Sequence, residues 1–173
     1  MKTNKIIWLI GIIIVLAVTF YFISPNQNTT PADWLTFTDE AGVYTFRYPQ
    51  DFGRQYVTPV DWPPQVNLLE GTGFNCTEGG MIYGRAGQTV SRTIEGQEYC
   101  ITTVSEGAAG SIYNQYAYLT VINRQPIGLI FTARLPQCVN YDEPRQDECK
   151  ADQAAFNPDV IISEIINSLE LTH

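Results

Sequence analysis

The chain has 173 residues and carries 18 acidic against 10 basic side chains, a net charge of −8 at pH 7. This acidity repels nucleic-acid phosphates and anionic lipid headgroups, so we predict no nucleic-acid partner. The single histidine is His173, which excludes a Ser-His-Asp or Cys-His nucleophile and a histidine-ligated metal site inside the fold.

The first predicted element is an uncharged apolar run of 18 residues from Ile6 to Ile23. As a helix it would be about 27 Å long, close to the ~30 Å hydrocarbon core of a bilayer. Lys2 and Lys5 precede the run, and the next basic residue is Arg47. By the positive-inside rule we predict a single-pass protein of the cell membrane, with a cytoplasmic N-terminus, an extracytoplasmic domain and the lipid bilayer as a partner.

A cleaved secretory signal is the alternative interpretation of this run. Signal peptides have apolar cores of about 7–15 residues followed by a small-x-small cleavage site. Here the run ends in bulky side chains, and Ala17 and Thr19 offer one poor site. The predicted organisation is therefore a cytoplasmic stub and transmembrane anchor over 1–23, a polar linker over 24–33, and one extracytoplasmic domain over 34–173.

The four cysteines all follow the apolar run, at Cys76, Cys100, Cys138 and Cys149. An even number of cysteines outside the cytoplasm predicts two disulfides. Cysteines adjacent in the sequence close smaller loops, which favours the pairs Cys76–Cys100 and Cys138–Cys149. A zinc site is the alternative, but the sequence has no C-x-x-C pair and no histidine near the cysteines.

The domain begins with a predicted β-hairpin. The runs 34–38 and 43–48 alternate aromatic and β-branched residues with polar ones, and the DEAG sequence between them is a turn signal. Pro49 ends the second strand because it has no N–H to donate to a neighbouring strand. Three prolines within 57–64 predict an extended loop there, before short strands at 66–69 and 81–83.

Longer strands are predicted in the centre of the chain. They cover 88–94, 98–105, 111–123 and 127–135, and the small residues within 106–111 indicate close backbone packing or a β-bulge. The 111–123 run is apolar on both faces: Ile112, Tyr116, Tyr118 and Ile122 share one, and Tyr113, Ala117, Leu119 and Val121 the other. This pattern is typical of a central strand covered on both sides.

The C-terminal part is predicted to be helical. A short helix covers 147–156, and Asn157-Pro158-Asp159 then combines a favoured N-cap, a first-turn proline and a first-turn acid. An apolar stripe follows at helical spacing, formed by Val160, Ile161, Ile165, Ile166 and Leu169. A last edge strand is predicted at 168–171. The fold class is therefore α+β: an antiparallel β-sheet with a C-terminal helix packed on it, preceded by one N-terminal transmembrane helix.

The ends of this domain resemble the PsbP-like family. The matching residues are Trp34, Phe37, Thr38, Gly42, Phe46, Tyr48 and Pro49, together with the 161–171 tail. The family includes photosystem extrinsic subunits, a nuclear-import Ran-binding factor and many exported bacterial proteins. The 106–111 segment and the Cys138–Cys149 loop look like those of uncharacterised membrane-anchored proteins of candidate-phyla bacteria.

This resemblance implies an antiparallel sheet with helices packed on it. It implies no catalytic residues, because the known members mostly bind other macromolecules. We therefore predict a membrane-anchored extracytoplasmic binding or scaffold module of the cell envelope, with an unidentified protein or envelope polymer as its partner. No cofactor, metal-binding or catalytic residue is predicted.

The alternative is a carboxylate-dependent hydrolase acting on envelope glycan, since such enzymes need two carboxyl groups. Glu95, Glu98 and Glu106 lie near strand ends and are its candidates, although solvated turn residues have the same pattern. The acidic run within 142–152 offers oxygen atoms that could bind calcium. It lacks the alternating spacing of a calcium loop, so a solvated loop is the simpler interpretation.

Overall fold

The structure is a computed structural model that describes residues 33–77 and 80–172. The predicted anchor between Ile6 and Ile23 lies outside the described residues, and so does most of the predicted linker. Within the part that is described, no helix has the length and hydropathy to cross a membrane. The anchor and the orientation that follows from it therefore stay predictions.

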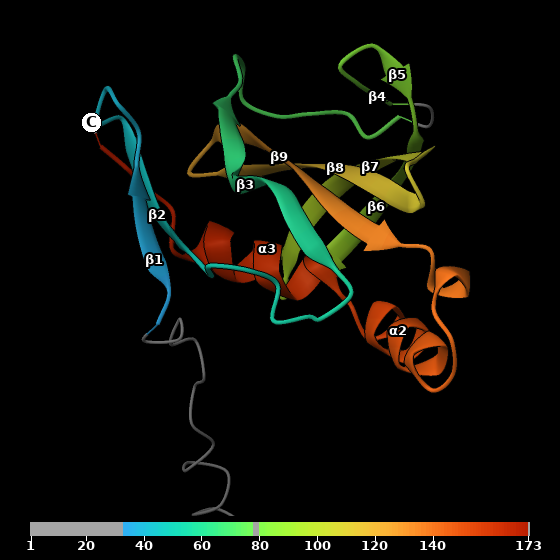
Figure 1. The fold of residues 1–173 in the computed structure, drawn as a ribbon. Coiled ribbons are helices and arrows are strands. Elements are labelled where there is room, and N and C mark those ends of the chain that lie inside the picture. The colour runs from blue at the N-terminus through green and yellow to red at the C-terminus, as the bar shows by residue number, and fades with distance from the viewer. Residues whose placement is uncertain (1–32, 78–79, 173) are drawn as a thin grey trace, which may run out of the picture.

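A five-stranded antiparallel sheet forms the centre of the domain (Figure 1). Its spatial order is β3-β9-β8-β7-β6, and the strands cover Thr58–Leu68 (β3), Gln88–Ile94 (β6), Gln97–Ala108 (β7), Ser111–Ile122 (β8) and Gln125–Pro136 (β9). The turns of the β7–β8 and β8–β9 hairpins each hold two residues with positive φ: Ala109 and Gly110, then Asn123 and Arg124. This is the two-residue turn that matches strand twist.

The small residues of 106–111 thus form the end of β7 and a hairpin turn. The expected bulge is wrong, because the β7–β8 register is regular through Gly107. The expected close packing is found at Gly110, where a Cβ would come within 3.1 Å of the Asn140 side chain, and not at Gly107, where it would meet nothing within 4 Å.

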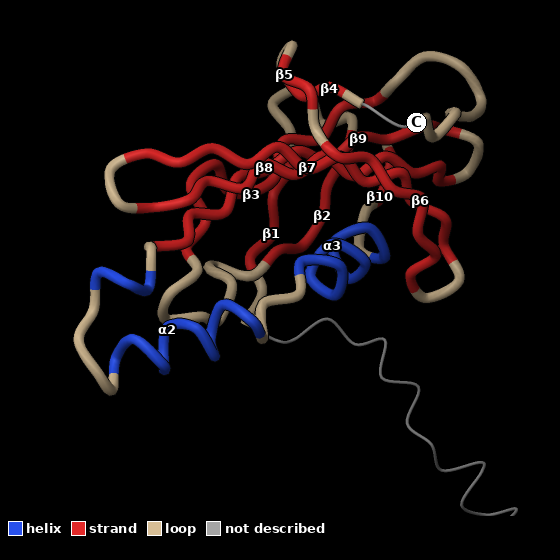
Figure 2. Tube along the Cα trace, turned by 90° about the vertical axis from the view of Figure 1, so that its right-hand side faces the viewer, coloured by secondary structure: helices blue, strands red, loops and turns tan. Residues whose placement is uncertain are grey.

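Two smaller sheets and two α-helices complete the α+β domain. The small sheets are β1 (Leu35–Thr38), β2 (Tyr44–Tyr48) and β10 (Glu170–Leu171), in the order β1-β2-β10, and the hairpin of β4 (Met81–Ile82) and β5 (Arg85–Ala86). The helical elements are the 3-10 turn η1 (Cys138–Asn140), α2 (Arg145–Ala154) and α3 (Pro158–Asn167). Figure 2 shows α2 and α3 below the central sheet and the β4–β5 hairpin above it. We call these sides the lower and upper faces.

The main hydrophobic core lies between the lower face and α3. Tyr118 and Phe131 from the sheet and Ile162 and Ile165 from the helix are almost completely buried. The predicted start of α3 is confirmed, because the Asn157 side chain accepts the Asp159 N–H at 3.1 Å. One member of the predicted stripe is wrong: Val160 is 50% exposed.

Ile162 takes the place predicted for Val160 in the core. Residues 162, 165, 166 and 169 follow i, i+3, i+4, i+7 spacing, which selects the helix face that the sheet covers.

The expected loop over 57–64 is in fact the first half of strand β3. Because β3 is the edge of its sheet, a proline N–H is not needed on the outer side. The register with β9 shifts between Pro59 and Asp61 and again between Asp61 and Gln65, where the other two prolines lie. An indole hydrogen bond from Trp62 to the Pro49 carbonyl, 2.7 Å long, attaches this irregular stretch to the end of β2.

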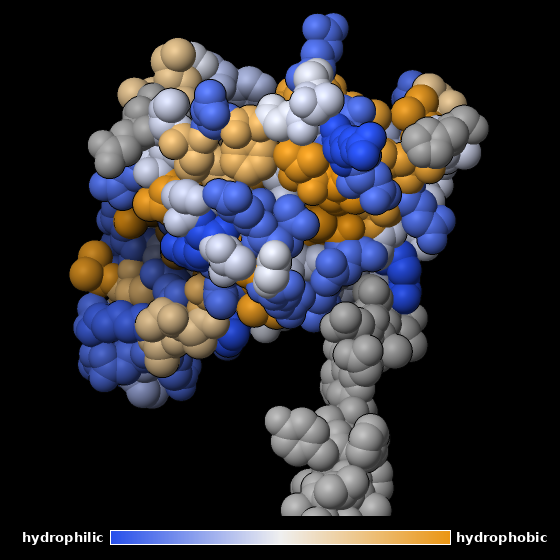
Figure 3. Space-filling model, turned by 180° about the vertical axis from the view of Figure 1, so that it is seen from behind, coloured by the Kyte–Doolittle hydropathy of each residue, from blue (hydrophilic) through white to orange (hydrophobic). Residues whose placement is uncertain are grey.

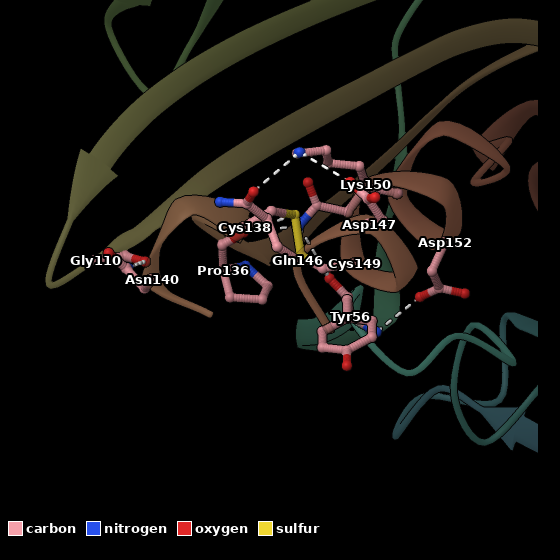
Figure 4. Close-up of a disulfide and its surroundings, with 11 residues drawn as sticks. Tyr56, Gly110, Pro136, Cys138, Asn140, Gln146, Asp147, Cys149, Lys150 and Asp152 are labelled. Carbon is pink, nitrogen blue, oxygen red and sulfur yellow. Dashed lines mark hydrogen bonds and ion pairs between the residues drawn. A yellow bond between two sulfur atoms is a disulfide. The ribbon is translucent and has the colours of Figure 1, made fainter. Parts of the chain in front are cut away.

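Both predicted disulfides, Cys76–Cys100 and Cys138–Cys149, are confirmed. The second joins η1 to α2 just after β9 (Figure 4). Beside it, the Tyr56 N–H donates to Asp152 of α2 at 2.7 Å, and the Gln153 side chain donates to the Pro136 carbonyl at 2.7 Å. This disulfide therefore belongs to a small structural cluster that holds α2 against the domain.

The burial of Tyr99 predicts a loss of stability at high pH. Burial, with Glu95 and Asp159 nearby, raises the pKa of Tyr99 from 10.0 to about 12. A raised pKa means that the unfolded chain loses this proton first, so the contribution to stability is complete below pH 10 and is lost as the pH rises towards 12. We expect Tyr99 to remove about 2 kcal/mol of the free energy of unfolding by pH 12.

Urea unfolding followed by circular dichroism between pH 8 and pH 12 measures this effect. Tyr99→Phe should flatten the decline. A decline that is equally steep without the Tyr99 hydroxyl would contradict the assignment.

Candidate functional site

The upper face of the central sheet carries a hollow across the middle of its strands. Two register rows form its floor: Asn67, Gly128, Leu119 and Cys100 in one, and Ile130, Ala117, Thr102 and Thr89 in the other. Large and small side chains alternate within this floor, since Leu119 and Ile130 stand diagonally opposite each other and so do Gly128 and Ala117. The hollow exists because the small residues Gly128 and Ala117 leave the space above them empty.

The described residues between β3 and β4, among them Leu69, Asn75, Thr77 and Gly80, form the wall of this hollow. The Cys76–Cys100 disulfide joins this wall to the floor. At its far end the Gly80 N–H donates to the Thr89 hydroxyl at 2.8 Å, and a Cβ on Gly80 would come within 2.5 Å of the same oxygen. Glycine is therefore required there, and this contact closes the hollow towards β6.

The result is an open pocket of about 440 Å³, which we call the sheet pocket. The described residues that line it are Asn67, Leu68, Leu69, Asn75, Thr77, Gly80, Met81, Thr89, Cys100, Thr102, Ala117, Tyr118, Leu119, Gly128 and Ile130. Leu68, Leu69 and Met81 are exposed, the last by 69%. None of the described lining residues is charged, so the pocket combines an apolar surface with amide and hydroxyl groups.

Apolar atoms are exposed on this part of the domain. Seen from behind, orange surface crosses the upper half of the molecule above a band of hydrophilic side chains (Figure 3). The β4–β5 hairpin lies on the same upper side in Figures 1 and 2. It is held by hydrogen bonds from Tyr83 to Gln65, 2.6 Å, and from Arg85 to Gln115, 2.7 Å.

The prediction that β8 is covered on both faces is therefore only half right. Its lower face, with Tyr118 1% exposed, packs in the core, and β4 crosses part of its upper face. Ala117 and Leu119, however, line the open pocket. Alternation within β8 could not reveal this, because the hollow also depends on Gly128 of β9.

Gly128 is the residue whose presence needs an explanation. Glycine in the interior of a strand destabilises it and usually marks a bulge, a bend or a close approach by another group. The register on both sides of Gly128 is regular, its φ is not positive, and a Cβ would meet its first neighbours, atoms of Asn67, only at 4.0 Å. Neither backbone shape nor internal packing requires a glycine, so the space above it is the feature that it provides.

The three glutamates predicted as candidate carboxylates are not brought together. Glu95 and Glu98 lie at the β6–β7 turn, where they meet Asn167 and Ser91, respectively. Glu106 lies at the other end of β7 and forms an ion pair with Arg85. It shares a smaller pocket of about 250 Å³ with Asp61 of β3, which accepts a hydrogen bond from Thr132 at 2.9 Å.

The acidic run around α2 is used for local structure. Lys150 bonds Asp147 at 3.1 Å, and Asp152 accepts the Tyr56 N–H and pairs with Arg54 at 3.7 Å. Across residues 33–77 and 80–172, no three His, Cys, Asp or Glu side chains are grouped so as to hold a metal ion. The calcium interpretation gains no support from this arrangement.

A charged cluster below the sheet was missed by the sequence prediction. Asp159 of α3, 8% exposed, accepts the Tyr118 hydroxyl at 2.6 Å and forms an ion pair with Arg92 of β6. The sequence identified Asp159 as a first-turn acid of a helix. Its partners are 41 and 67 residues away in the chain, and nothing local connects them to it.

Comparisons with known proteins leave the family open. No protein-family model matches the chain, and no curated protein matches it. Among solved structures, a crystal structure of a Bacteroides thetaiotaomicron protein is similar, with a TM-score of 0.40 and 11% identity, over 82% of this chain and 49% of that one. The chain thus spans about half the length of that protein. The likeness is too low to carry an argument, and the resemblance to the PsbP-like family stays a prediction.

Proposed function

We propose that the protein is a membrane-anchored binding module of the cell envelope, and that its ligand or partner occupies the sheet pocket. The observation that carries this proposal is the open space above Gly128, which the fold itself does not require. The apolar run between Ile6 and Ile23 supports the membrane location, and the two disulfides suit an oxidising compartment.

The chemistry of the pocket limits what it can bind. Its described lining offers no counter-charge, so an ionic group placed there would lose its hydration without compensation. The exposed side chains of Leu68, Leu69 and Met81 suit an apolar group, and Asn75 and Thr77 can form hydrogen bonds at the rim. We therefore expect an uncharged, partly apolar ligand group, and a pocket of this size is within the usual range for ligand sites.

Filling the pocket is expected to abolish binding without loss of stability. In Gly128→Leu the new side chain enters the pocket, while its Cβ makes only ordinary contact with Asn67. Leucine also suits a strand better than glycine, so the free energy of unfolding should stay the same or rise by up to ~1 kcal/mol. Capture from native membranes with the full-length protein should enrich a ligand with the wild type and lose it with the variant.

Gly107→Leu is the matched control. Gly107 is also a strand glycine with no atom within 4 Å of a Cβ, but it does not line the pocket. This variant should capture the same ligand as the wild type. Equal capture by Gly128→Leu and Gly107→Leu would show that the pocket is not the binding site.

A hydrolase acting on envelope glycan is the second candidate, and one observation favours it: Asp61 and Glu106 share the smaller pocket. Against it, Glu106 already serves as the counter-ion of Arg85, and a glycosidase needs one of its two carboxyl groups free to act as an acid. Sugar release from envelope preparations that disappears in both Asp61→Asn and Glu106→Gln would establish the hydrolase in place of the binding module.

A further inference from the structure

Strand β6 is an open edge of the central sheet. It pairs with β7 in a regular register over all seven residues, and no other strand within residues 33–77 and 80–172 pairs with it. Among the described residues, no backbone group outside β7 bonds its main chain. Alternate residues of β6 therefore present N–H and C=O groups outward, and such an edge can template the pairing of another strand.

Most of the usual devices that protect an edge strand are missing from β6, and the charge of Arg92 is the exception. Its sequence, QTVSRTI, contains no proline and no lysine, its pairing with β7 contains no bulge, and Val90 is 46% exposed. The opposite edge, β3, contains three prolines and two register shifts, and β1, at the edge of the small sheet, has four residues. The contrast with β3 shows that this sheet is protected far more heavily on one edge than on the other.

The single charged side chain of β6, Arg92, is engaged within the domain. Arg92 forms its ion pair with Asp159 on the lower side, where α3 lies. Next to the strand, Glu95 and Glu98 add negative charge at the turn that follows β6. The chain after Ile23 carries 8 basic and 18 acidic side chains, so two copies brought edge to edge would repel each other.

We propose that β6 is a docking edge for an extended, basic segment of another polypeptide, which adds as an antiparallel sixth strand. The backbone of the segment would bond the outer edge of β6, and its Lys or Arg side chains would lie near Glu95 and Glu98. This is strand addition to an open sheet edge, in which main-chain hydrogen bonds provide the attachment and side chains provide selectivity. The site is the outer backbone edge of β6, whereas the sheet pocket reaches β6 only at the side chain of Thr89, where the contact with Gly80 closes it.

A peptide derived from the natural neighbour of β6 provides the probe. It has the sequence of residues 98–104, with Glu98→Lys to supply a cation and Cys100→Ser to remove the thiol, and both ends are blocked. Antiparallel pairing then repeats on the outer edge the side-chain pairs that β7 forms on the inner one, such as Ile101 with Val90. The matched control is the same peptide with N-methyl groups at alternate residues on the edge that would face β6.

The full-length protein in detergent is mixed with each peptide, and amide hydrogen exchange is measured. We expect slower exchange at residues 88–94 with the unmodified peptide, no change with the methylated one, and weaker binding at higher salt. Val90→Lys should reduce affinity about tenfold through the loss of an apolar pair and the added positive charge. Val160→Lys, at an equally exposed valine on α3, should leave it unchanged.

Three results would overturn the proposal: equal binding of the methylated peptide, protection confined to residues outside 88–94, or self-association of the chain through 88–94 without peptide. Gly128→Leu fills the sheet pocket and should leave peptide binding intact. Failure of the pocket proposal and failure of the edge proposal are therefore distinguishable.

Discussion

Replacing Asp159 with alanine is expected to lower the free energy of unfolding by about 3 kcal/mol. The Tyr118 hydroxyl, in a side chain that is 1% exposed, would lose its acceptor at 2.6 Å, and Arg92 would lose its counter-ion. A buried donor without a partner costs more than the hydrogen bond itself contributed. Chemical denaturation at neutral pH measures the change.

Two further variants divide this effect between the partners of Asp159. Asp159→Asn keeps an oxygen for Tyr118 but loses the ion pair with Arg92, whose side chain is half exposed, so it should cost less than alanine. Tyr118→Phe removes the donor together with the need for an acceptor and should also cost less. A change below ~1 kcal/mol in Asp159→Ala would mean that water satisfies both partners, and the cluster would not be a structural element.

Removing the Cys76–Cys100 disulfide is expected to lower the free energy of unfolding by about 3.5 kcal/mol and to abolish ligand capture by the sheet pocket. The bond closes a loop with a sequence separation of 24 residues, so its loss frees the unfolded chain considerably. It also joins the wall of the pocket to its floor at Cys100. The double variant Cys76→Ser/Cys100→Ser tests both effects, by denaturation and by capture.

The other disulfide provides the control. Cys138 and Cys149 are separated by 11 residues and hold α2 to the end of β9, away from the pocket. Cys138→Ser/Cys149→Ser should cost about 2.8 kcal/mol and leave capture unchanged under conditions where both variants are folded. If both double variants lose capture equally, the loss reports general destabilisation and not the geometry of the pocket.

Local chemistry in the sequence was sufficient to predict much of this fold. The hairpin of β1 and β2, the four long strands of the centre, and the Asn157 cap of α3 each depend on residues close together in the chain. The same is true of the disulfides, because each joins neighbouring cysteines. Such features need no knowledge of distant partners, since turn, cap and short-loop preferences act over a few residues to a few tens of residues.

The tertiary structure decided the features that depend on residues far apart. Pro59, Pro63 and Pro64 predict a loop because proline cannot donate to a strand. Nevertheless β3 contains all three as an edge strand, and its place at the edge follows from how the whole sheet assembles. In the same way, Asp159 is a helix-start residue in the sequence and the counter-ion of Arg92 only after α3 packs under β6.

For the candidate site, too, some features were determined by the sequence and others by the tertiary structure. The sequence alone determined that the single histidine is His173 and that a strongly acidic domain follows an apolar run. The sheet pocket arises from the strand register, which pairs the small Ala117 with the large Ile130 and the small Gly128 with the large Leu119. It also depends on a disulfide that joins a distant segment to this part of the sheet. Strand register and sheet order are set by long-range pairing, so only the folded chain places these side chains on one surface.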